Sequence, residues 1–351
     1  MKISIVGAGL IGTSMGLGLK GSGHEIAFAD IDPSRQRIAQ DLVGLSFEGL
    51  AELIVIATPV EAQIESLKRA FDANPQAMFI DISGLKSELL DYVENFSELA
   101  KRFVATHPMA GREISGPAAA RADLFEGRTW IVTPTSRTQD DVLDRVITII
   151  DQLGASSVTR SAQEHDHAIA LVSHLPQVMS SLTAAALVDQ NQKAIDLAGQ
   201  GLRDVSRLAD SPTALWKELL IRNREELLPI LSGIKNELGN IIDAIQNSDA
   251  RKLEDILIKG NTGRSLIPGK HGGANRNYFY LPIVIEDKPV QLAKIVDECA
   301  QAEVNIEDLS IEHSPGQETG LITLALSKED ADVLYAQLVQ NGWRVHEAFT
   351  L

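Results

Sequence analysis

Cysteine is almost absent from this chain, since Cys299 is the only one among 351 residues. A single cysteine excludes an internal disulfide, and the shortage favours a reducing compartment. Cys299 stands in an apolar, helix-compatible stretch, so we expect it to be buried. No uninterrupted apolar run approaches the roughly 18 residues of a membrane span. The N-terminus enters a strand-like stretch at once, without a basic leader or signal peptide, so we expect a cytoplasmic protein without a membrane partner.

Positive charge is also scarce. Lysine and arginine total 32 against 48 acidic residues, which gives a formal net charge of −16. This balance argues against nucleic acid or an anionic membrane as the main partner. An anionic substrate would need a locally basic pocket. The length predicts two or three domains, and 44% hydrophobic with 23% charged residues is ordinary for a globular protein.

The most informative feature that is present is a glycine turn at the N-terminus. Gly7, Gly9 and Gly12 form G-x-G-x-x-G after the apolar run Met1–Val6, and a helix-compatible stretch, Thr13–Lys20, follows. A strand, a glycine turn and a helix form the phosphate-binding unit of a dinucleotide fold. Close backbone approach and the free N–H groups of the helix N-terminus suit a pyrophosphate. The predicted cofactor contacts in this turn are Gly7, Gly9, Leu10, Ile11 and Gly12.

An acidic residue follows at the expected distance. The apolar stretch Glu25–Ala29 ends in Asp30, about 20 positions after the glycines, where a carboxylate meets the ribose 2′-hydroxyl. Asp30 would repel a 2′-phosphate, so we predict NAD rather than NADP as the cofactor. Arg35 and Arg37 keep NADP open, because an arginine there can accommodate that phosphate. The alternative is a glycine turn of another α/β domain, with Asp30 capping a loop.

Short apolar runs alternate with amphipathic stretches over residues 1–155, which predicts an α/β fold with a Rossmann-type parallel sheet. The predicted strands are Lys2–Val6, Ile26–Ala29, Leu53–Ala57, Met78–Ile82, Phe103–Thr106 and Trp130–Thr133. Thr58-Pro59 and His107-Pro108 each follow a strand. Ligands of open α/β sheets bind along this carboxyl edge, so we predict that Thr58 and Pro59 contact the cofactor.

The rest of the chain divides into two further regions. Residues 156–260 are almost entirely helix-compatible and predict an all-helical domain for substrate binding and dimerisation, in which long apolar helices favour a homodimer. Residues 261–277, rich in glycine, predict a linker or a loop. Residues 278–351 follow the order β-α-β-β-α-β, which predicts a ferredoxin-like split fold.

Two clusters after the glycine turn could carry chemistry. His107 follows a strand where a nicotinamide ring would lie, and an imidazole there can accept a hydroxyl proton as hydride leaves. A loop-capping histidine is the alternative. Arg203 and Arg207 lie four apart, so on a helix they share a face and could clamp a carboxylate, or they could belong to a solvated face.

A third cluster contains His165 and His167 between acidic residues. The i, i+2 spacing places the two histidines on different faces of a helix, and no further ligand set is evident. We therefore predict no metal site.

Several ordered motifs resemble one enzyme family. After GAGLIG come HPMAGRE with SG, LFEGRTWIVTP, SHLP and GLRDVSRLADSPTALW. Together they resemble the prephenate or arogenate dehydrogenase family of tyrosine biosynthesis, over residues 1 to about 265. The tail, with EDKP, VNIED and GWRV, resembles an ACT domain, a small amino-acid-sensing module, so tyrosine is an expected effector there.

The resemblance implies roles for individual residues. His107 would bond the ring 4-hydroxyl and assist its deprotonation. Ser83 stands where the family's D-x-G-S-x-K has glycine, so the helping hydroxyl is displaced by one position. The residues that would bind substrate are Glu113, His174, Gln177, Arg203, Arg207 and Trp216.

Two further departures accompany these roles. Where the family has SHLPH, this chain has SHLPQ, with Gln177 in place of the second histidine. The preference between prephenate and arogenate therefore stays open. In the tail, D-x-P-G reads Asp287-Lys-Pro289-Val290, and the missing glycine could weaken an effector site.

The resemblance implies an NAD-dependent oxidative decarboxylation of prephenate. Arogenate is the alternative substrate. A 3-hydroxyacid-type dehydrogenase is a further alternative, but no lysine holds a comparable motif between Ala162 and Arg207. The last alternative is a non-catalytic sensor of NAD or amino acids, against which His107 and the arginine pair argue.

Overall fold

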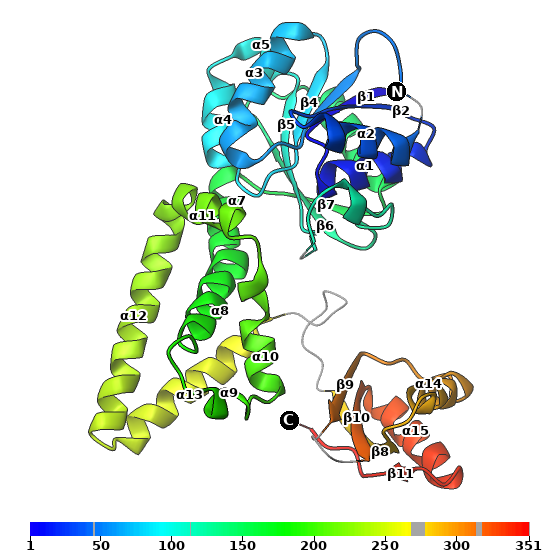
Figure 1. Cartoon of the computed structure of the whole chain (residues 1–351), viewed down its shortest axis with the longest axis vertical. Coiled ribbons are helices and arrows are strands. Elements are labelled where there is room, and N and C mark those ends of the chain that lie inside the picture. Colours follow the sequence, from blue (N-terminus) through cyan, green and yellow to red (C-terminus); the bar gives the residue numbers. More distant parts are fainter. Residues whose placement is uncertain (45, 113, 268–277, 314–317, 351) are drawn as a thin grey trace. The chain divides into compact units, whose positions relative to one another are not determined.

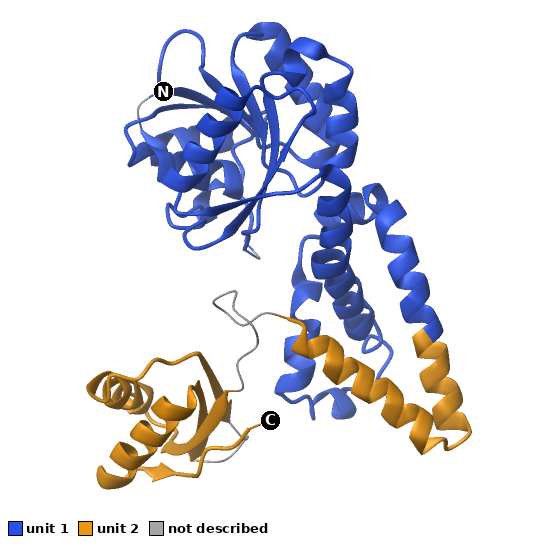
Figure 2. Cartoon of the chain, turned by 180° about the vertical axis from the view of Figure 1, so that it is seen from behind, with its two compact units in different colours: residues 1–236 blue, residues 237–351 orange. Residues whose placement is uncertain are grey.

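The computed structural model describes residues 1–44, 46–112, 114–267, 278–313 and 318–350. By contacts, the chain divides into two compact units, Met1–Asn236 and Glu237–Leu351 (Figure 2).

The first unit begins with a seven-stranded sheet in the order β2-β1-β3-β4-β5-β6-β7 (Figure 1). Its strands are β1 (Lys2–Val6), β2 (Glu25–Ala29), β3 (Leu53–Ile56), β4 (Met78–Asp81), β5 (Phe103–Pro108), β6 (Thr129–Pro134) and β7 (Ser156–Thr159). All six predicted strands are present. The chain passes from β1 outward to β2 and then returns to β3 on the other side of β1. This reversal creates the crevice at which open α/β sheets bind their ligands.

One expectation for this sheet was wrong. Strands β1 to β5 pair in parallel, but β6 pairs with β5 antiparallel. The edge strand β7, parallel to β6, was not predicted at all. The sheet is therefore parallel over the strands that carry the glycine turn and His107, and reversed at one edge.

Helices cover both faces of the sheet because every central strand is apolar on both sides; β3 and β4 are buried at every position. Helices α1 and α2 lie on one side, and α3, α4 and α5 on the other (Figure 1). The helices of this part are α1 (Leu10–Lys20), α2 (Pro33–Val43), α3 (Gln63–Ala73), α4 (Ser87–Glu94), α5 (Ser97–Ala100) and α6 (Asp140–Gln152), with short 3₁₀ turns at Val60–Ala62 and Pro117–Ala119.

A helical region follows the sheet, as predicted. It consists of α7 (Ala162–Ile169), a π-helical turn (Ala170–His174), α8 (Leu175–Ala185), α9 (Gln192–Ile195), α10 (Gln200–Ser206), a 3₁₀ turn (Arg207–Asp210), α11 (Thr213–Arg222) and α12 (Arg224–Gln246). Ser161 begins α7 with a capping box, in which its hydroxyl and the Glu164 carboxylate bond each other's backbone N–H.

The run Ala162–Ala185 is long and apolar enough, by length and composition alone, to cross a membrane. A single such helix is weak evidence, because core helices pass the same test. This run also carries the buried polar side chains His165, Asp166 and His174, which contact other parts of the first unit. We interpret it as a helix of the folded unit.

The second unit contains the end of α12, α13 (Ala250–Ser265) and a module of four strands and two helices. Helix α13 includes residues 261–265, which were predicted as the start of a linker, and residues 268–277 of that linker lie outside the described residues. The module consists of β8 (Phe279–Glu286), α14 (Gln291–Gln301), β9 (Asp308–His313), β10 (Thr319–Leu326), α15 (Lys328–Gln340) and β11 (Arg344–Val345). Its antiparallel sheet has the order β11-β8-β10-β9. Cys299 is buried in its core, as expected.

Val290 marks a strained turn before α14. Its φ of 77° lies in the left-handed region, and its side chain is 64% exposed. A residue with a Cβ loses roughly 1–2 kcal/mol in this conformation, and a β-branched residue is a marked outlier there. A glycine at this position would adopt this φ without strain.

We therefore expect Val290→Gly to raise the free energy of unfolding by up to about 1 kcal/mol, after the greater entropy of unfolded glycine is subtracted. Val296→Gly is the matched control, because Val296 is also exposed but lies within α14. It should lower stability, since glycine is a poor helix former. Urea unfolding of both variants measures these changes. An equal loss of free energy of unfolding in the two variants would contradict backbone strain at Val290.

Candidate functional site

The glycine turn forms a close-packed cradle between β1 and α1. Gly7 has φ 110°, and a Cβ on it would lie 2.5 Å from the carbonyl oxygen of Ala57. A Cβ on Gly12 would lie 2.4 Å from the carbonyl oxygen of Gly7. Only glycine fits at either position. Around Gly9, by contrast, a Cβ would meet no atom of the described residues within 4 Å, and none of their side chains caps α1, which begins at Leu10 and Ile11. This end of α1 is therefore open to an anionic group.

Asp30 is fixed beside this turn. Its carboxylate accepts hydrogen bonds from the backbone N–H of Ala8 at 2.6 Å and of Asp32 at 2.8 Å. A carboxylate has about four acceptor sites, so Asp30 can also accept from a diol. Arg35 lies 3.4 Å from Asp32, and Arg37 donates to the carbonyl of Pro33, so both arginines interact with the start of α2.

Thr58 and Pro59 follow β3 at the same edge, one and two residues after Ala57. The Thr58 hydroxyl is buried and has no hydrogen-bond partner among the described residues. Buried hydroxyls normally have one, so this group suits a polar ligand atom. The cradle, the open helix N-terminus and Asp30 together fit a dinucleotide.

A buried ion pair lies beneath the neighbouring strands. Lys86 and Asp81 are both fully buried, and the Lys86 ammonium donates to Asp81 Oδ2 and to the carbonyl of Thr106. Asp81 also accepts from Gln63 Nε2 at 2.6 Å and from the backbone N–H of Thr106 at 3.0 Å. Burial lowers the pKa of Lys86, and the Asp81 carboxylate opposes that shift. The pair therefore fixes the ends of β4 and β5 to the segment before α4.

Ser83 belongs to this cluster. Its hydroxyl donates to Asp81 Oδ2 at 2.8 Å and accepts from Gln63 at 2.9 Å and from Lys86 at 3.3 Å. The structure thus does not join Ser83 to His107 by a hydrogen bond. A Cβ on the next residue, Gly84, would be 3.9 Å from His107 Nε2.

His107 is joined instead to a residue of α7. Its Nδ1 lies 2.8 Å from His165 Nε2, and His165 Nδ1 lies 2.7 Å from Asp166 Oδ1. Asp166 also accepts from the backbone N–H groups of Lys86 and Ser87, both at 2.9 Å, at the start of α4. Within the described residues, His107 Nε2 has no hydrogen-bond partner.

Sequence reasoning missed His165 and Asp166. The two histidines of α7 do face different ways: His165 is buried, whereas His167 is exposed and lies 2.8 Å from Glu226. A signal was available, because the capping box at Ser161 fixes the start of α7 and hence which residues face inward. No group of three or more potential metal ligands occurs among the described residues.

The surroundings keep these groups in defined charge states. Burial lowers the pKa of His107 well below its ordinary value near 6.5; His165 and Lys86 lower it further, and Asp166 opposes them. Burial would raise the pKa of Asp166, but hydrogen bonds from His165, Ser87 and Lys86 outweigh it and lower that pKa. His107 is thus neutral near pH 7 beside an ionised Asp166.

His174 and Trp216 lie close to this chain of groups. His174 ends the π-helical turn and is buried, and its ring meets the Trp216 ring edge to face at 5.8 Å. Asn223 Nδ2 lies 3.2 Å from His174 Nδ1 and donates to the carbonyl of Asp166 at 2.9 Å. Burial lowers the pKa of His174 to about 4. π-Helical turns occur frequently at functional sites.

Gln177 is the next predicted residue, and it is buried. Its Nε2 donates to the carbonyl of Leu208 at 2.8 Å, while its Oε1 has no partner among the described residues. An acceptor without a partner in this position suits a ligand that donates a hydrogen bond.

The two arginines and Glu113 complete the predicted set. Arg203 lies within α10 and Arg207 begins the 3₁₀ turn, and both are exposed. The Arg203 guanidinium donates to the carbonyl of Ala198 at 3.2 Å. Glu113 lies outside the described residues.

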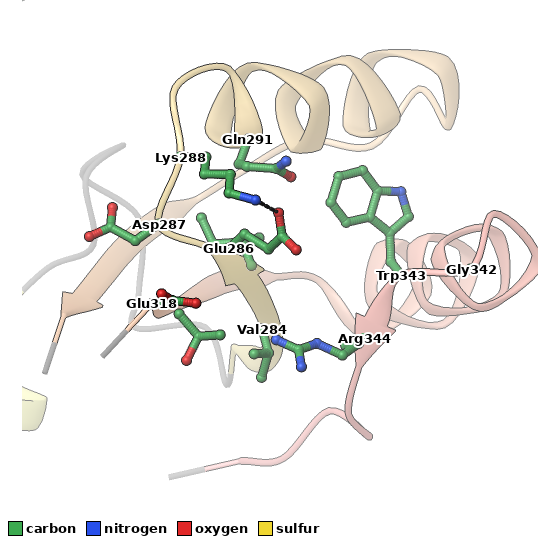
Figure 3. Close-up of a pocket in the computed structure, with 11 residues that line it drawn as sticks. Val284, Glu286, Asp287, Lys288, Gln291, Glu318, Gly342, Trp343 and Arg344 are labelled. Atoms are coloured by element: carbon green, nitrogen blue, oxygen red, sulfur yellow. Dashed lines mark ion pairs between the residues drawn. The ribbon is translucent and has the colours of Figure 1, made fainter. Parts of the chain in front are cut away.

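The C-terminal module has a pocket of its own, of about 790 Å³ (Figure 3). It lies around the end of β8 and the start of β11. Its lining includes three acidic residues, two basic ones and an indole: Glu286, Asp287, Glu318, Lys288, Arg344 and Trp343. Lys288 pairs with Glu286 at 2.9 Å. Charges of both signs suit a zwitterion.

Comparison with protein families gives two adjacent matches. Residues 15–159 match the model of the prephenate dehydrogenase nucleotide-binding domain, and residues 161–259 match that of the prephenate dehydrogenase dimerization domain. The border between them falls at the start of α7.

Individual proteins agree with this result. The chain is 30% identical to a prephenate dehydrogenase of Lactococcus lactis, over 82% of this chain and 83% of that protein. It is 28% identical to a probable prephenate dehydrogenase, NovF, of Streptomyces niveus, over 97% and 98%. Among solved structures, it resembles prephenate dehydrogenase from A. aeolicus in complex with hydroxyphenyl propionate and NAD⁺. That similarity has a TM-score of 0.68, 26% identity and coverage of 75% of this chain and 97% of the other.

Proposed function

The chain belongs to the prephenate dehydrogenase family, and on that premise we propose that it oxidises and decarboxylates prephenate to 4-hydroxyphenylpyruvate with NAD as hydride acceptor. The observation that carries this proposal is the open Nε2 of His107, at the same sheet edge as the glycine cradle and Asp30. The cradle supports NAD as the cofactor, held by Gly7, Gly9, Leu10, Ile11, Gly12, Asp30, Thr58 and Pro59.

The residues of the chain have distinct tasks in this reaction. His107 Nε2 accepts the proton of the ring hydroxyl as the C–H bond at the same carbon breaks. NAD held in the glycine cradle would supply the hydride acceptor for that carbon. Loss of the ring carboxylate as CO₂ then makes the ring aromatic, which supplies the driving force. The protein therefore contributes the base, the alignment and the charge around it.

Substrate binding falls to the helical region. We propose that Arg207 binds a substrate carboxylate and that Arg203 and Glu113 also contribute to substrate binding. His174, Trp216 and Gln177 would contact the remainder of the substrate, and the contact of His174 with Trp216 supports a shared pocket. Ser83 would hold the Asp81–Lys86 pair in place rather than act on His107 directly.

The direct test is NADH formation, followed by absorbance, when the purified chain receives NAD and prephenate. We expect turnover with formation of 4-hydroxyphenylpyruvate and CO₂ in equal amounts. Binding of NAD without any turnover would favour a sensor instead of an enzyme.

Arogenate is a second candidate substrate, because one observation favours it. Gln177 Oε1 is a buried acceptor without a partner among the described residues, and arogenate carries an ammonium group where prephenate carries a keto oxygen. Comparing kcat/KM for the two substrates in wild type and in Gln177→His separates them. A shift toward prephenate in the variant would assign this role to Gln177.

Cofactor choice provides a separate prediction. We expect kcat/KM with NAD to exceed that with NADP by at least about tenfold, or roughly 1.4 kcal/mol, because Asp30 accepts from the ribose diol and repels a 2′-phosphate. Asp30→Ala should narrow the ratio of kcat/KM with NAD to kcat/KM with NADP, whereas Asp41→Ala, at an exposed position of α2, should leave it unchanged. Equal efficiency of the two cofactors in wild type would show that Arg35 or Arg37 outweighs the carboxylate.

We further propose the domain borders 1–155, 156–260, 261–277 and 278–351, a cytoplasmic location and a homodimer. Several apolar side chains of the π-helical turn and α8 are exposed in the single chain: Leu171, Val172, Met179 and Leu182. A second copy would cover them, in agreement with the dimerization model that matches this region. Sedimentation equilibrium should give twice the mass of one chain.

The C-terminal module is proposed to be an ACT-like regulatory domain with a ferredoxin-like fold. Its element order and the strand order β11-β8-β10-β9 support this assignment. The pocket with charges of both signs supports an amino-acid effector, and tyrosine is the candidate (Figure 3).

A chain that ends at Ile267, after α13, should therefore keep its kcat but lose any response to tyrosine. The coupling expected for such an effector is about 1–3 kcal/mol, or roughly 5- to 150-fold in affinity. Tyrosine is titrated into both forms under one assay. Inhibition that survives the truncation would place tyrosine in the active site as a product-like competitor.

A further inference from the structure

The chain of groups behind His107 fixes which nitrogen of the base carries its proton. The starting point is Asp166, which accepts two backbone N–H bonds at the start of α4 and is ionised near neutral pH. An ionised carboxylate only accepts. The proton in its 2.7 Å contact with His165 must therefore sit on His165 Nδ1.

The direction of the hydrogen bond between His165 and His107 follows from that of the bond between His165 and Asp166. An imidazole whose single proton is on Nδ1 presents Nε2 as an acceptor. His107 Nδ1, 2.8 Å away, must then be the donor. A neutral His107 with a proton on Nδ1 has a lone pair on Nε2, which is the nitrogen left open at the sheet edge.

We propose that Asp166 and His165 are positioning residues: they hold His107 in the Nδ1–H tautomer and stabilise the positive charge that it gains when Nε2 takes the substrate proton. Resting on the proposed function, this inference adds two residues to the mechanism. Asp166 and His165 act only through His107. When Nε2 is protonated, His107 becomes positively charged. The hydrogen bonds from His107 to His165 and from His165 to Asp166 let the Asp166 carboxylate stabilise that charge.

The other charged groups near His107 act in the opposite sense. Lys86, from the segment before α4, and His174, from the π-helical turn, both disfavour a positive charge on His107. Asp81 is paired with Lys86, so Asp166 is the anion that reaches His107 through a hydrogen-bonded partner. Without it, protonated His107 would be surrounded by cations and neutral rings.

Asp166→Asn is the decisive variant, because it keeps the shape of the side chain and removes the charge. An uncharged amide no longer requires a proton on His165 Nδ1, so both hydrogen bonds can reverse and the His107 proton can move to Nε2. A wrong tautomer of a catalytic histidine lowers kcat by about 10⁴-fold in the serine proteases. We expect a loss of at least about 10²-fold in kcat, the low end of what a general base contributes, with KM and the Kd for NAD within about twofold.

The pH profile separates this role from a purely structural one. Removing the anion makes the protonated state of His107 less stable, so the acid limb of kcat/KM should move to lower pH in Asp166→Asn. The matched control is Glu226→Gln, which removes a carboxylate 2.8 Å from Nδ1 of the exposed His167 on the same helix. It should leave kcat and the profile unchanged.

A measurement on the wild type covers the case in which Asp166→Asn does not fold. Chains carrying ¹⁵N-labelled histidine, assigned with His107→Asn, should show His107 protonated on Nδ1 and bare on Nε2 at pH 7.5. An Nε2–H tautomer, or a kcat within threefold of wild type in folded Asp166→Asn, would overturn the proposal. Because the spectra do not depend on turnover, failure of the prephenate assay leaves this test intact.

Discussion

Replacing Lys86 by methionine is expected to lower the free energy of unfolding by about 3–5 kcal/mol, the usual effect of removing one partner from a buried ion pair. Methionine fills similar space, so the loss is mainly electrostatic. It leaves the Asp81 carboxylate fully buried without its cation, and the carbonyl of Thr106 loses a donor. Urea unfolding of full-length protein measures the change.

The direction in which a second substitution changes the free energy of unfolding tests this explanation. Adding Asp81→Asn to Lys86→Met removes the uncompensated charge while keeping an acceptor for the backbone of Thr106. We expect the double variant to be more stable than Lys86→Met alone by about 1 kcal/mol or more, within the range seen for interacting pairs. Lys101→Met, which breaks an exposed pair with Glu98, should change little. A double variant less stable than Lys86→Met would place the role of Lys86 in packing.

His107→Asn should lower kcat by about 10²- to 10⁴-fold while the Kd for NAD is unchanged, because a general base acts in the transition state and does not contact the cradle. Asparagine keeps a polar side chain of similar reach but cannot accept a proton at neutral pH. Single-turnover assays with bound NAD measure the chemical step. A normal kcat would remove His107 from the mechanism.

The wild-type pH profile adds a directional check. The reaction needs neutral His107, and burial lowers the pKa of this histidine well below 6.5. The protonated, inactive form therefore accumulates only at acidic pH. We expect kcat/KM to stay level from pH 7.5 through 6.5 and to fall below that range. A fall already centred at or above pH 6.5 would contradict the burial effect.

Sequence patterns located the strands well because each is a short apolar run between polar segments. They could not reveal the direction of β6, since Trp130 and Val132 are buried in the same alternating way whether the strand runs parallel or antiparallel. Strand β7 was missed because Val158 is its only large apolar residue. An edge strand needs little apolar surface, so it leaves little trace in the sequence.

In the candidate site, too, the sequence predicted features that are local in the chain but not contacts between distant residues. The glycine cradle and Asp30 are local in sequence, and their geometry follows from residue type and spacing. The partnership of His107 with His165 joins residues 58 positions apart, so it depends on how α7 packs against β5. Ser83 is a related case, because motif position alone did not reveal that its hydroxyl points into the Asp81–Lys86 pair.

Because Cys299 is buried, its rate of chemical labelling reports how often the C-terminal module opens. A thiol reacts as the thiolate, and burial raises the pKa of Cys299 to about 11, so the folded module protects it doubly. A thiol reagent can then modify the protein only while α14 and the strands around it are transiently open. The modification rate measures that opening equilibrium, at a factor of ten for every 1.4 kcal/mol. Since no other cysteine competes, release of strain at Val290 could be followed as slower labelling of this one atom.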